Sequence, residues 1–418
     1  MTVESTPVKA NDWRNSKLLL SLLVAVLVGL MFFGNLRFGA YLGDWYNSDM
    51  MVIWLGSKGL LEGVDIYDVA VWEQLHADTG SEYRDYEIFL YPFPAVFVFA
   101  PLALLPIDIS GALWLLALEL MYIFCVWWFL TRIPTARKLS RFLVLALAVA
   151  VFPPFFLILW FVQYGVAMLF FLVVAVALFE MDRPETDFLG AMYVPLLLFR
   201  PNPIVALIPA IGLWLLWRRR WWAIAGGIVS GLLLLGVGWL VRPNWVQIWL
   251  DFALERGGRT ETHGALTSTV YGMLTWMFPD LSGMGMTITL TVINVTIVGV
   301  ALWALWRARD FSLPAVVALF SCVSLLVTPY SFQYDHILIL FTVLWLLERA
   351  EGSAPRTRDL AWWVGLLTLL VPTLLVKLLI ADLELEYRAE VLVPLVAYGV
   401  AIWGLLALKP RLPEPVSH

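Results

Sequence analysis

The chain has 418 residues, of which 61% are hydrophobic, 14% are charged and 22 are tryptophans. This composition excludes an ordinary soluble domain and is typical of polytopic membrane proteins. The net charge of −5 argues against a nucleic-acid partner. The two cysteines and four histidines form no metal or cofactor motif, so we expect no cofactor and name no metal ligand, while leaving a divalent metal open.

The first predicted membrane span is Leu18–Leu36, which follows three basic residues. Its length is close to the ~20 residues that a helix needs to cross a bilayer. It is longer than the core of a signal peptide, and no small-residue cleavage site follows it. We therefore interpret it as a retained span.

The interval after this span is acidic and begins the first predicted outer loop, residues 37–109. Asp49–Glu62 and Val69–Ala77 carry Trp and Leu on one side and charges on the other, as interfacial helices do. Tyr91–Pro106 is apolar but contains four prolines. If it does not span, the basic residues at 132–141 fall inside, as the positive-inside rule favours. We therefore predict that it does not fully cross.

Together with the later apolar runs, the first span predicts an all-α polytopic membrane protein with about twelve spans. The distribution of basic residues places both termini in the cytoplasm. Arg200–Pro203 splits the run Phe188–Trp217 into two crossings, because proline both ends and restarts helices. We expect residues 1–418 to form a single domain with a second outer loop at 242–285. The other predicted spans are Ser110–Leu130, Leu139–Leu157, Tyr164–Glu180, Trp221–Val241, Met286–Trp306, Ser312–Val327, Gln333–Leu347, Ala361–Ile380 and Val391–Leu408.

This topology places an unusual set of polar residues on the outer side of a cell membrane. A carboxylate there could take the proton of an acceptor hydroxyl, and a cation such as Arg200 or His336 could hold a phosphate leaving group. A site with one base and no second carboxylate to act as a nucleophile fits a single displacement, in which the configuration of the attacked carbon is inverted. The candidates for these roles are Asp44, Asp49, Tyr91, Gln163, Arg200, Arg256, Arg259, Asp335 and His336.

Several short motifs follow one another in an order that is more specific than any one of them. Asp49 precedes a Leu-Leu-Glu-Gly turn that ends at Gly63, and an Ile-Tyr-Asp step follows at 66–68. Tyr91-Pro92-Phe93-Pro94 then enters an apolar run that closes as Pro-Leu-Ala-Leu-Leu-Pro at 101–106. This series resembles the start of glycosyltransferase family 87, a mannosyltransferase-like family of the GT-C type that uses polyprenol-phosphate sugars.

The resemblance extends to about residue 350. Gln163 matches the Gly-Gln turn of the family, with Val162 in place of the glycine, and Arg200-Pro201 matches a Lys/Arg-Pro pair at a broken helix. Thr328-Pro329-Tyr330 and Tyr334-Asp335-His336 are similar to a further family motif, and Phe332 stands where Trp is common.

The resemblance implies a hexosyltransferase. It would move a hexose, most commonly mannose, from a polyprenyl-phosphate donor to a glycan or glycolipid acceptor at the extracytoplasmic face of the lipid bilayer. Asp49 takes the place of the family's catalytic Asp. Because it begins a predicted helix, we expect the helix N-terminus to lower its pKa and keep it ionised.

Other interpretations remain open at this point. The chain could be a transporter or flippase for a lipid-linked or small polar substrate, although it has one clear helix break and its polar residues lie outward. It could also be a scaffold without catalysis. Individually, Arg200 could extend to the interface, Gln163 could hold helices together, and His336, Asp44, Arg256 and Arg259 could be structural or solvated.

Overall fold

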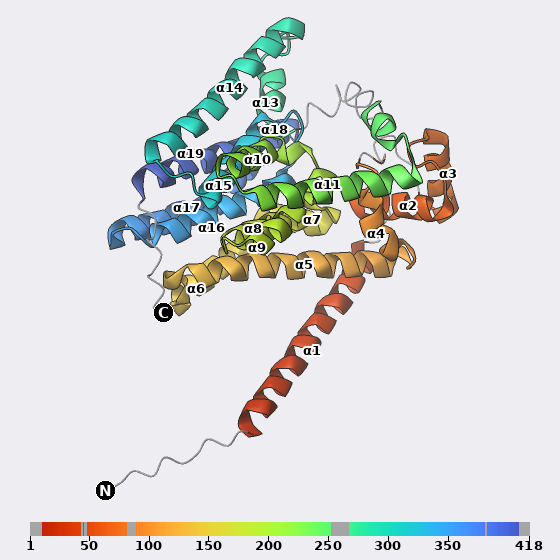
Figure 1. The fold of residues 1–418 in the computed structure, drawn as a ribbon, viewed down its shortest axis with the longest axis horizontal. Coiled ribbons are helices and arrows are strands. Elements are labelled where there is room, and N and C mark those ends of the chain that lie inside the picture. Colours follow the sequence, from red (N-terminus) through yellow and green to blue (C-terminus); the bar gives the residue numbers. More distant parts are fainter. Residues whose placement is uncertain are drawn as a thin grey trace.

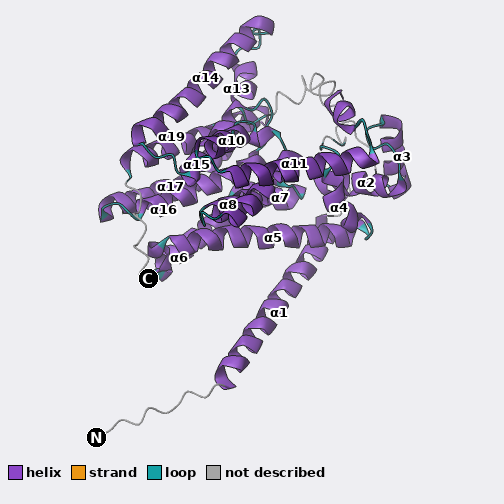
Figure 2. Ribbon diagram, in the orientation of Figure 1, coloured by secondary structure: helices purple, strands orange, loops and turns teal. Residues whose placement is uncertain are grey.

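The protein is described here from a computed structural model that covers residues 11–42, 45, 48–81, 89, 91–251, 267–380 and 383–408. Asp44, Arg256 and Arg259 lie outside these described residues. Every regular element within them is helical, and no strand occurs in that part of the chain (Figure 2). The predicted all-α fold class is therefore confirmed.

The N-terminal third contains one long helix, three short ones and a second long one. Their bounds are α1 (Asn11–Leu42), α2 (Asp49–Glu62), α3 (Val69–Thr79), α4 (Ala95–Ala103) and α5 (Ile107–Arg132). The middle of the chain forms η2 (Pro134–Arg137), α6 (Leu139–Ala150), α7 (Pro153–Phe161), α8 (Gly165–Phe179), α9 (Pro184–Met192), η3 (Pro195–Phe199), η4 (Asn202–Ile204), α10 (Leu207–Trp217) and α11 (Trp221–Val241).

The C-terminal part begins after the undescribed residues of the second predicted outer loop. It contains α13 (Val270–Met277), α14 (Gly283–Ala308), α15 (Leu313–Val327), η6 (Gln333–Leu338), α16 (Ile339–Ala350), α17 (Pro355–Leu379), α18 (Leu383–Ala389) and α19 (Leu392–Ala407).

The helices of the first predicted outer loop form where the sequence indicates. α2 has the predicted bounds, and its chain turns at Gly63, which has a φ of 72° that favours glycine. Asp68 caps α3 by accepting hydrogen bonds from the N–H groups of Ala70 and Val71. α4 has nine residues and would extend only about 14 Å. It is too short to cross a bilayer on its own, which is consistent with the expectation for Tyr91–Pro106.

Five helices in the described part of the chain are long and apolar enough to cross a membrane: α5, α11, α14, α17 and the segment Leu385–Ala407. A sixth is counted if α6 and α7, which bend by 42° at their break, form one span. Four shorter apolar segments add to these. The chain is thus a polytopic membrane protein, and the predicted count of about twelve spans is not confirmed.

Two predicted spans differ from the structure in a way that proline explains. Leu139–Leu157 is not one straight helix, because Pro153 and Pro154 begin a new helix after α6. The segment Phe188–Trp217 is interrupted over a longer stretch than Arg200–Pro203. Regular α-helix ends at Met192, and only 3₁₀ turns occur before α10.

Most of the long helices lie side by side, and α2–α4 gather at one end of the bundle (Figure 1). We call this end the α2 end. α5, α8 and the continuous pair η6–α16 each run from it to the opposite end, as their first and last residues show. α1 contacts the bundle through α5, where Asn35 donates a hydrogen bond to Glu119 at 3.0 Å, and otherwise points away from it.

Candidate functional site

The α2 end brings together five of the predicted site residues: Tyr91, in the loop before α4, and four from more distant parts of the sequence. Asp49 is the first residue of α2, Gln163 lies in the turn before α8, Arg200 lies in the broken segment before α10, and Asp335 lies in η6. We call these residues, together with Tyr91, Tyr330 and Tyr334, the Asp49 cluster. The sequence could predict only that its members share one side of the membrane.

α2 holds Asp49 in place through close packing. The hydroxyl of Ser57 donates to the carbonyl of Val96 on α4 at 3.1 Å. A side chain at Gly56 would meet the ring of Phe89 at 2.7 Å, so only glycine permits this approach. Asp49 itself is half-buried at the helix start, and its carboxylate has no hydrogen-bond or ion-pair partner among the described residues.

Arg200 is held firmly at the helix break. Its Nε lies 2.8 Å from Oδ1 of Asp335, its Nη2 donates to Oδ2 at 3.3 Å, and its Nη1 donates to the amide oxygen of Gln163. The guanidinium carbon lies 4.6 Å from the centre of the Tyr334 ring. Arg200 therefore does not extend toward the interface, and Gln163 is more than a packing residue.

Asp335 uses both of its oxygens within the protein. Besides Arg200, Oδ2 accepts hydrogen bonds from the Phe332 N–H at 3.0 Å and the Ser331 hydroxyl at 3.3 Å. These contacts fix the position of the carboxylate beside Arg200. Of the two carboxylates in the cluster, only that of Asp49 is free of such contacts among the described residues.

The electrostatics of Asp49 differ from the expectation. Burial raises the pKa of Asp49 to about 6, the charge of Arg200 opposes this increase, and the charge of Asp335 adds to it. The predicted lowering by the helix N-terminus is therefore wrong, because loss of hydration outweighs a helix-end effect of less than about 1 kcal/mol. A pKa of about 6 still leaves the carboxylate mostly ionised at neutral pH, which suits a general base.

Tyr91 completes the cluster from the loop before α4. Burial raises the pKa of its hydroxyl, and the neighbouring charge of Asp49 raises it further, so the hydroxyl stays neutral. Its backbone carbonyl accepts a hydrogen bond from the Tyr67 hydroxyl at 2.9 Å. Asp65, two residues before Tyr67, forms an ion pair with Arg242 at the end of α11.

The ion pair between Asp65 and Arg242 fastens the first loop to the bundle. Burial raises the pKa of Asp65, but hydrogen bonds from Arg242 and from the Tyr67 N–H at 2.9 Å outweigh burial and hold it below its ordinary value. Sequence reasoning missed this pair and missed Tyr334 as a platform for Arg200. A basic residue at the end of a span and a tyrosine in the 334–336 motif were the available signals.

His336 is fully buried in η6, and its ring lies against the backbone of Ser268. Its role as a phosphate-binding cation stays a prediction, and so do the substrate-binding roles of Asp44, Arg256 and Arg259, which lie outside the described residues. Within the described residues, no group of three or more His, Cys, Asp and Glu side chains could hold a metal ion. The described part of the cluster thus places the carboxylate of Asp49 near the cation Arg200.

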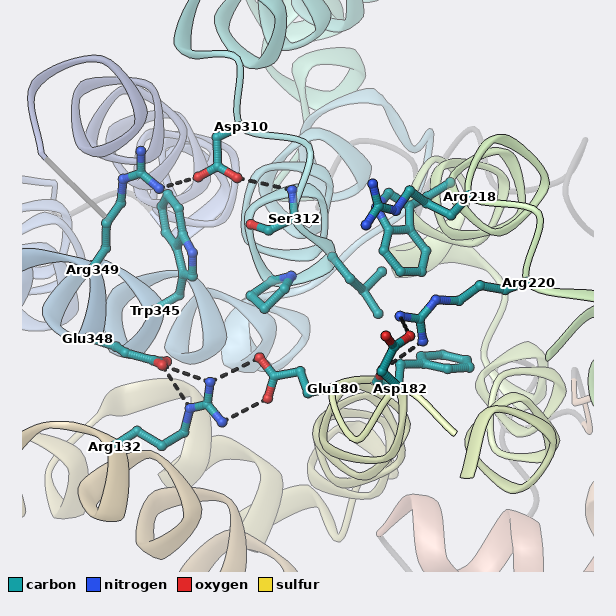
Figure 3. Close-up of a pocket in the computed structure, with 14 residues that line it drawn as sticks. Arg132, Glu180, Asp182, Arg218, Arg220, Asp310, Ser312, Trp345, Glu348 and Arg349 are labelled. Carbon is teal, nitrogen blue, oxygen red and sulfur yellow. Dashed lines mark hydrogen bonds and ion pairs between the residues drawn. The ribbon is translucent and has the colours of Figure 1, made fainter. Parts of the chain in front are cut away.

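A second charged region lies at the opposite end of the bundle, and sequence reasoning did not single it out (Figure 3). We call it the Arg132 pocket, after the arginine at the end of α5. Three of its four arginines pair with carboxylates of neighbouring segments, and the pairs include Arg132 with Glu180 and Glu348, and Arg349 with Asp310. α8 separates the two regions by roughly 20 Å, given 1.5 Å of rise per helical residue.

Comparison with known families identifies the chain. The sequence model of glycosyltransferase family 87 matches residues 89–329, which is more than half of the 418 residues. The protein belongs to glycosyltransferase family 87. Comparisons with curated proteins and with solved structures gave no significant match.

Family membership makes the chain a membrane glycosyltransferase and argues against a transporter or a scaffold. The matched residues contain Tyr91, Gln163 and Arg200, whereas Asp49 lies before them and Asp335 after them. The geometry thus joins a residue from each flank to the core of the family 87 region.

Proposed function

We propose that this family 87 glycosyltransferase transfers a hexose, with mannose as the first choice, from a polyprenyl-phosphate donor. The acceptor is a hydroxyl group of a glycan or glycolipid at the extracytoplasmic face of the membrane. The observation that carries the proposal is the Asp49 carboxylate, which is half-buried, has no partner among the described residues and lies in the same cluster as Arg200. A base beside a cation is what an acceptor hydroxyl and a phosphate leaving group require.

The reaction would be a single displacement. The acceptor oxygen attacks the anomeric carbon while Asp49 takes the acceptor proton, and the bond to the donor phosphate oxygen breaks with its electron pair. Arg200 would hold that phosphate with the N–H groups that Asp335 and Gln163 leave over, since a guanidinium has five donors. With Asp335 already bound to Arg200, the described part of the cluster offers no second carboxylate as a nucleophile, and we expect inversion at the anomeric carbon.

The proposed topology places the α2 end outside and both termini in the cytoplasm, with residues 1–418 as one domain. A lipid-linked donor fits this arrangement, because its phosphate would lie at the headgroup level beside the first outer loop. The predicted loops 37–109 and 242–285 would both face the acceptor. No cofactor enters this proposal.

The direct test uses the purified protein in lipid nanodiscs with polyprenyl-phosphate mannose, polyprenyl-phosphate glucose and a nucleotide sugar as separate donors. We expect transfer from a polyprenyl-phosphate donor only, with a product of inverted anomeric configuration by NMR. Transfer from the nucleotide sugar would overturn the donor assignment, and a retained configuration would overturn the mechanism. Movement of the lipid donor across proteoliposomes without a new glycosidic bond would support a flippase instead.

A further inference from the structure

The Arg132 pocket is a cavity of about 440 Å³ at the end of the bundle far from Asp49 (Figure 3). It lies between the ends of α5, α8, α10 and α16 and the start of α15. Its walls combine charged side chains with the aromatic rings of Phe179, Trp214 and Trp345. The reaction proposed above uses none of these residues.

Most of the charges in this pocket are matched. Arg349 pairs with Asp310, and it also donates to the carbonyls of Gly404 at 3.0 Å and Leu405 at 3.3 Å. Arg220 pairs with Asp187 at 2.6 Å and with Asp182, whose side chain is 81% exposed and therefore solvated. These groups need no ligand.

One negative charge in the pocket is left over. Arg132 is shared by two glutamates: its two terminal nitrogens lie 2.7 and 2.9 Å from the oxygens of Glu180, and its Nε lies 2.8 Å from Oε1 of Glu348. One guanidinium cannot neutralise two carboxylates. Both glutamates also lie at helix C-termini, where the helix dipole disfavours a negative charge.

One positive charge is also left over. Arg218, at the end of α10, lines the pocket and has no carboxylate partner in the part of the chain that the structure describes; its guanidinium lies 5.8 Å from the ring of Trp217. Figure 3 draws Arg218 on a different wall from the group formed by Arg132, Glu180 and Glu348. The pocket therefore offers one cation and one anion that are spatially separated.

Several of the residues around Arg218 are apolar and exposed. Trp217, Trp221 and Trp222 are exposed, and so are Leu213 and Leu216 on the adjoining surface of α10. Exposed tryptophans next to basic residues are typical of the level of the headgroups. A lipid could thus lie along α10 with its headgroup at the pocket, as headgroups do in basic pockets between membrane helices.

We propose that the Arg132 pocket binds the phosphoethanolamine headgroup of a phospholipid. The phosphate oxygens accept hydrogen bonds from Arg218, and the ammonium group donates to the oxygens of Glu180 and Glu348. A choline headgroup has no N–H to donate, and a glycerol headgroup has no positive charge for the glutamates. The pocket therefore prefers phosphatidylethanolamine to phosphatidylcholine and phosphatidylglycerol.

The test is native mass spectrometry of the delipidated full-length protein, titrated with each of the three lipids. The wild type should retain phosphatidylethanolamine best. Arg218→Gln should weaken this binding roughly tenfold, since a charged hydrogen bond is lost. Glu348→Gln should remove the preference over phosphatidylcholine, with folding checked by thermal unfolding. The matched control is Arg307→Gln, because Arg307 is also exposed beside an exposed tryptophan but does not line the pocket.

Equal retention of the three lipids by the wild type would overturn the proposal. The same loss in Arg307→Gln as in Arg218→Gln would also overturn it, because the effect would then come from surface charge in general. Stronger retention of phosphatidylglycerol would mean that the glutamates do not face the headgroup. Soluble glycerophosphoethanolamine carries the headgroup without the acyl chains. If it displaced bound phosphatidylethanolamine at an equal concentration, the exposed α10 surface would contribute nothing to the affinity, and the lipid would not be the ligand.

Discussion

The two ends of the bundle both place an arginine between carboxylates, but they do so to different effect. In the Arg132 pocket, Glu180 and Glu348 both contact the arginine directly, and the three side chains join the ends of three helices. In the Asp49 cluster, Asp335 is the one described carboxylate that pairs with Arg200, and the Asp49 carboxylate has no partner among the described residues. The comparison separates charges that hold helices together from a charge that is available for chemistry.

The backbones that carry these side chains differ as well. The residues around Arg132 lie at the ends of regular helices, so their positions follow from helix packing. Arg200 and Asp335 instead lie in 3₁₀ turns and loop residues between prolines and short helices. Irregular backbone at the ends of membrane helices is tolerated where protein buries it or where it lines a cavity. At the α2 end, the irregular backbone thus lets Arg200 and Asp335 point in directions that a continuous helix would not allow.

The largest expected effect concerns the side of the membrane on which each end lies. A cysteine at position 137, near Arg132, should resist a membrane-impermeant maleimide in intact cells, because the basic residues at 132–141 are predicted to be cytoplasmic. A cysteine in place of Glu73, which is exposed on α3, should react fully. The native Cys125 and Cys322 are buried and need not be removed. Efficient labelling at 137 would reverse the assignment of the two ends.

The next largest effect is expected for Asp49→Asn, which keeps the size of the side chain and removes its basicity. Turnover should fall by ~10²–10⁴-fold, the usual loss for a general base, while binding of the donor is largely kept. The variant should unfold at the same temperature as the wild type or higher, because Asn avoids burying a charge.

Transfer assays and donor binding on the purified variant check this expectation. Asp78→Asn is the control, since Asp78 lies on α3 in the same loop and accepts a hydrogen bond from the exposed Gln74. Near wild-type turnover in Asp49→Asn would remove Asp49 as the base. Asp335 would then become the remaining carboxylate of the cluster, and the contrast between the two ends would lose its chemical meaning.

Arg200→Gln should weaken donor binding by roughly ten- to a hundredfold, corresponding to the ~1.5–3 kcal/mol of a charged hydrogen bond. Acceptor binding should change less. Arg220→Gln is a matched control from the other end, because the side chains of Arg200 and Arg220 are 12% and 13% exposed and each pairs with aspartate. Equal losses of donor affinity in the two variants would show that Arg200 acts only through folding.

Arg349→Gln should act on stability and not on chemistry. It leaves Asp310 without its cation and removes donors to Gly404 and Leu405, so we expect a loss of about 3–5 kcal/mol in unfolding free energy. Turnover per folded molecule should be unchanged. Arg358→Gln is the weak counterpart, because its ion pair with Glu351 is 4.0 Å long. Thermal unfolding of both variants measures the effect on stability, and transfer assays measure the effect on catalysis. Reduced turnover in folded Arg349→Gln would contradict the assignment of stability to the Arg132 pocket and of catalysis to the Asp49 cluster.

Local signals in the sequence predicted the elements of the fold well. α2 and α11 have the predicted bounds because a left-handed glycine ends one and basic residues flank the other. Proline signals were applied too narrowly: Pro153 and Pro195 alter the helices as Pro201 does, but the apolar runs around them read as continuous spans. A hydropathy pattern records how apolar a run is and not whether its helix is straight.

The contacts of the site could not be derived in the same way. Arg200 and Asp335 are 135 residues apart, and no periodicity in either segment specifies that they meet. The family motifs pointed to Asp49, Gln163 and Arg200 individually, and the structure adds which of them touch. The pKa of Asp49 depends on burial, which the helix position alone could not reveal.

The smallest and most diagnostic effect concerns pH. With a pKa of about 6 for Asp49, kcat/KM should rise with pH through about 6 as the carboxyl group loses its proton. The contribution of Asp49 to the free energy of unfolding changes with pH in the opposite direction. The folded-state pKa lies above the ordinary value of 3.8, so the contribution of this group to stability is present below about pH 4 and is lost as pH rises through about 6. Asp49→Asn should flatten that part of the stability profile.

Asp335→Asn then tests whether the two carboxylates are electrostatically coupled. The charge of Asp335 raises the pKa of Asp49, and the charge of Arg200 lowers it. Removing the first and leaving the second without its partner both favour ionised Asp49, so the acid limb of kcat/KM should move to lower pH while the maximal rate falls. No corresponding shift should follow Arg349→Gln at the far end. An acid limb that stays at the same pH in Asp335→Asn would mean that the titrating group is not Asp49, because no other carboxylate in the described part of the cluster lies beside both Arg200 and Asp335.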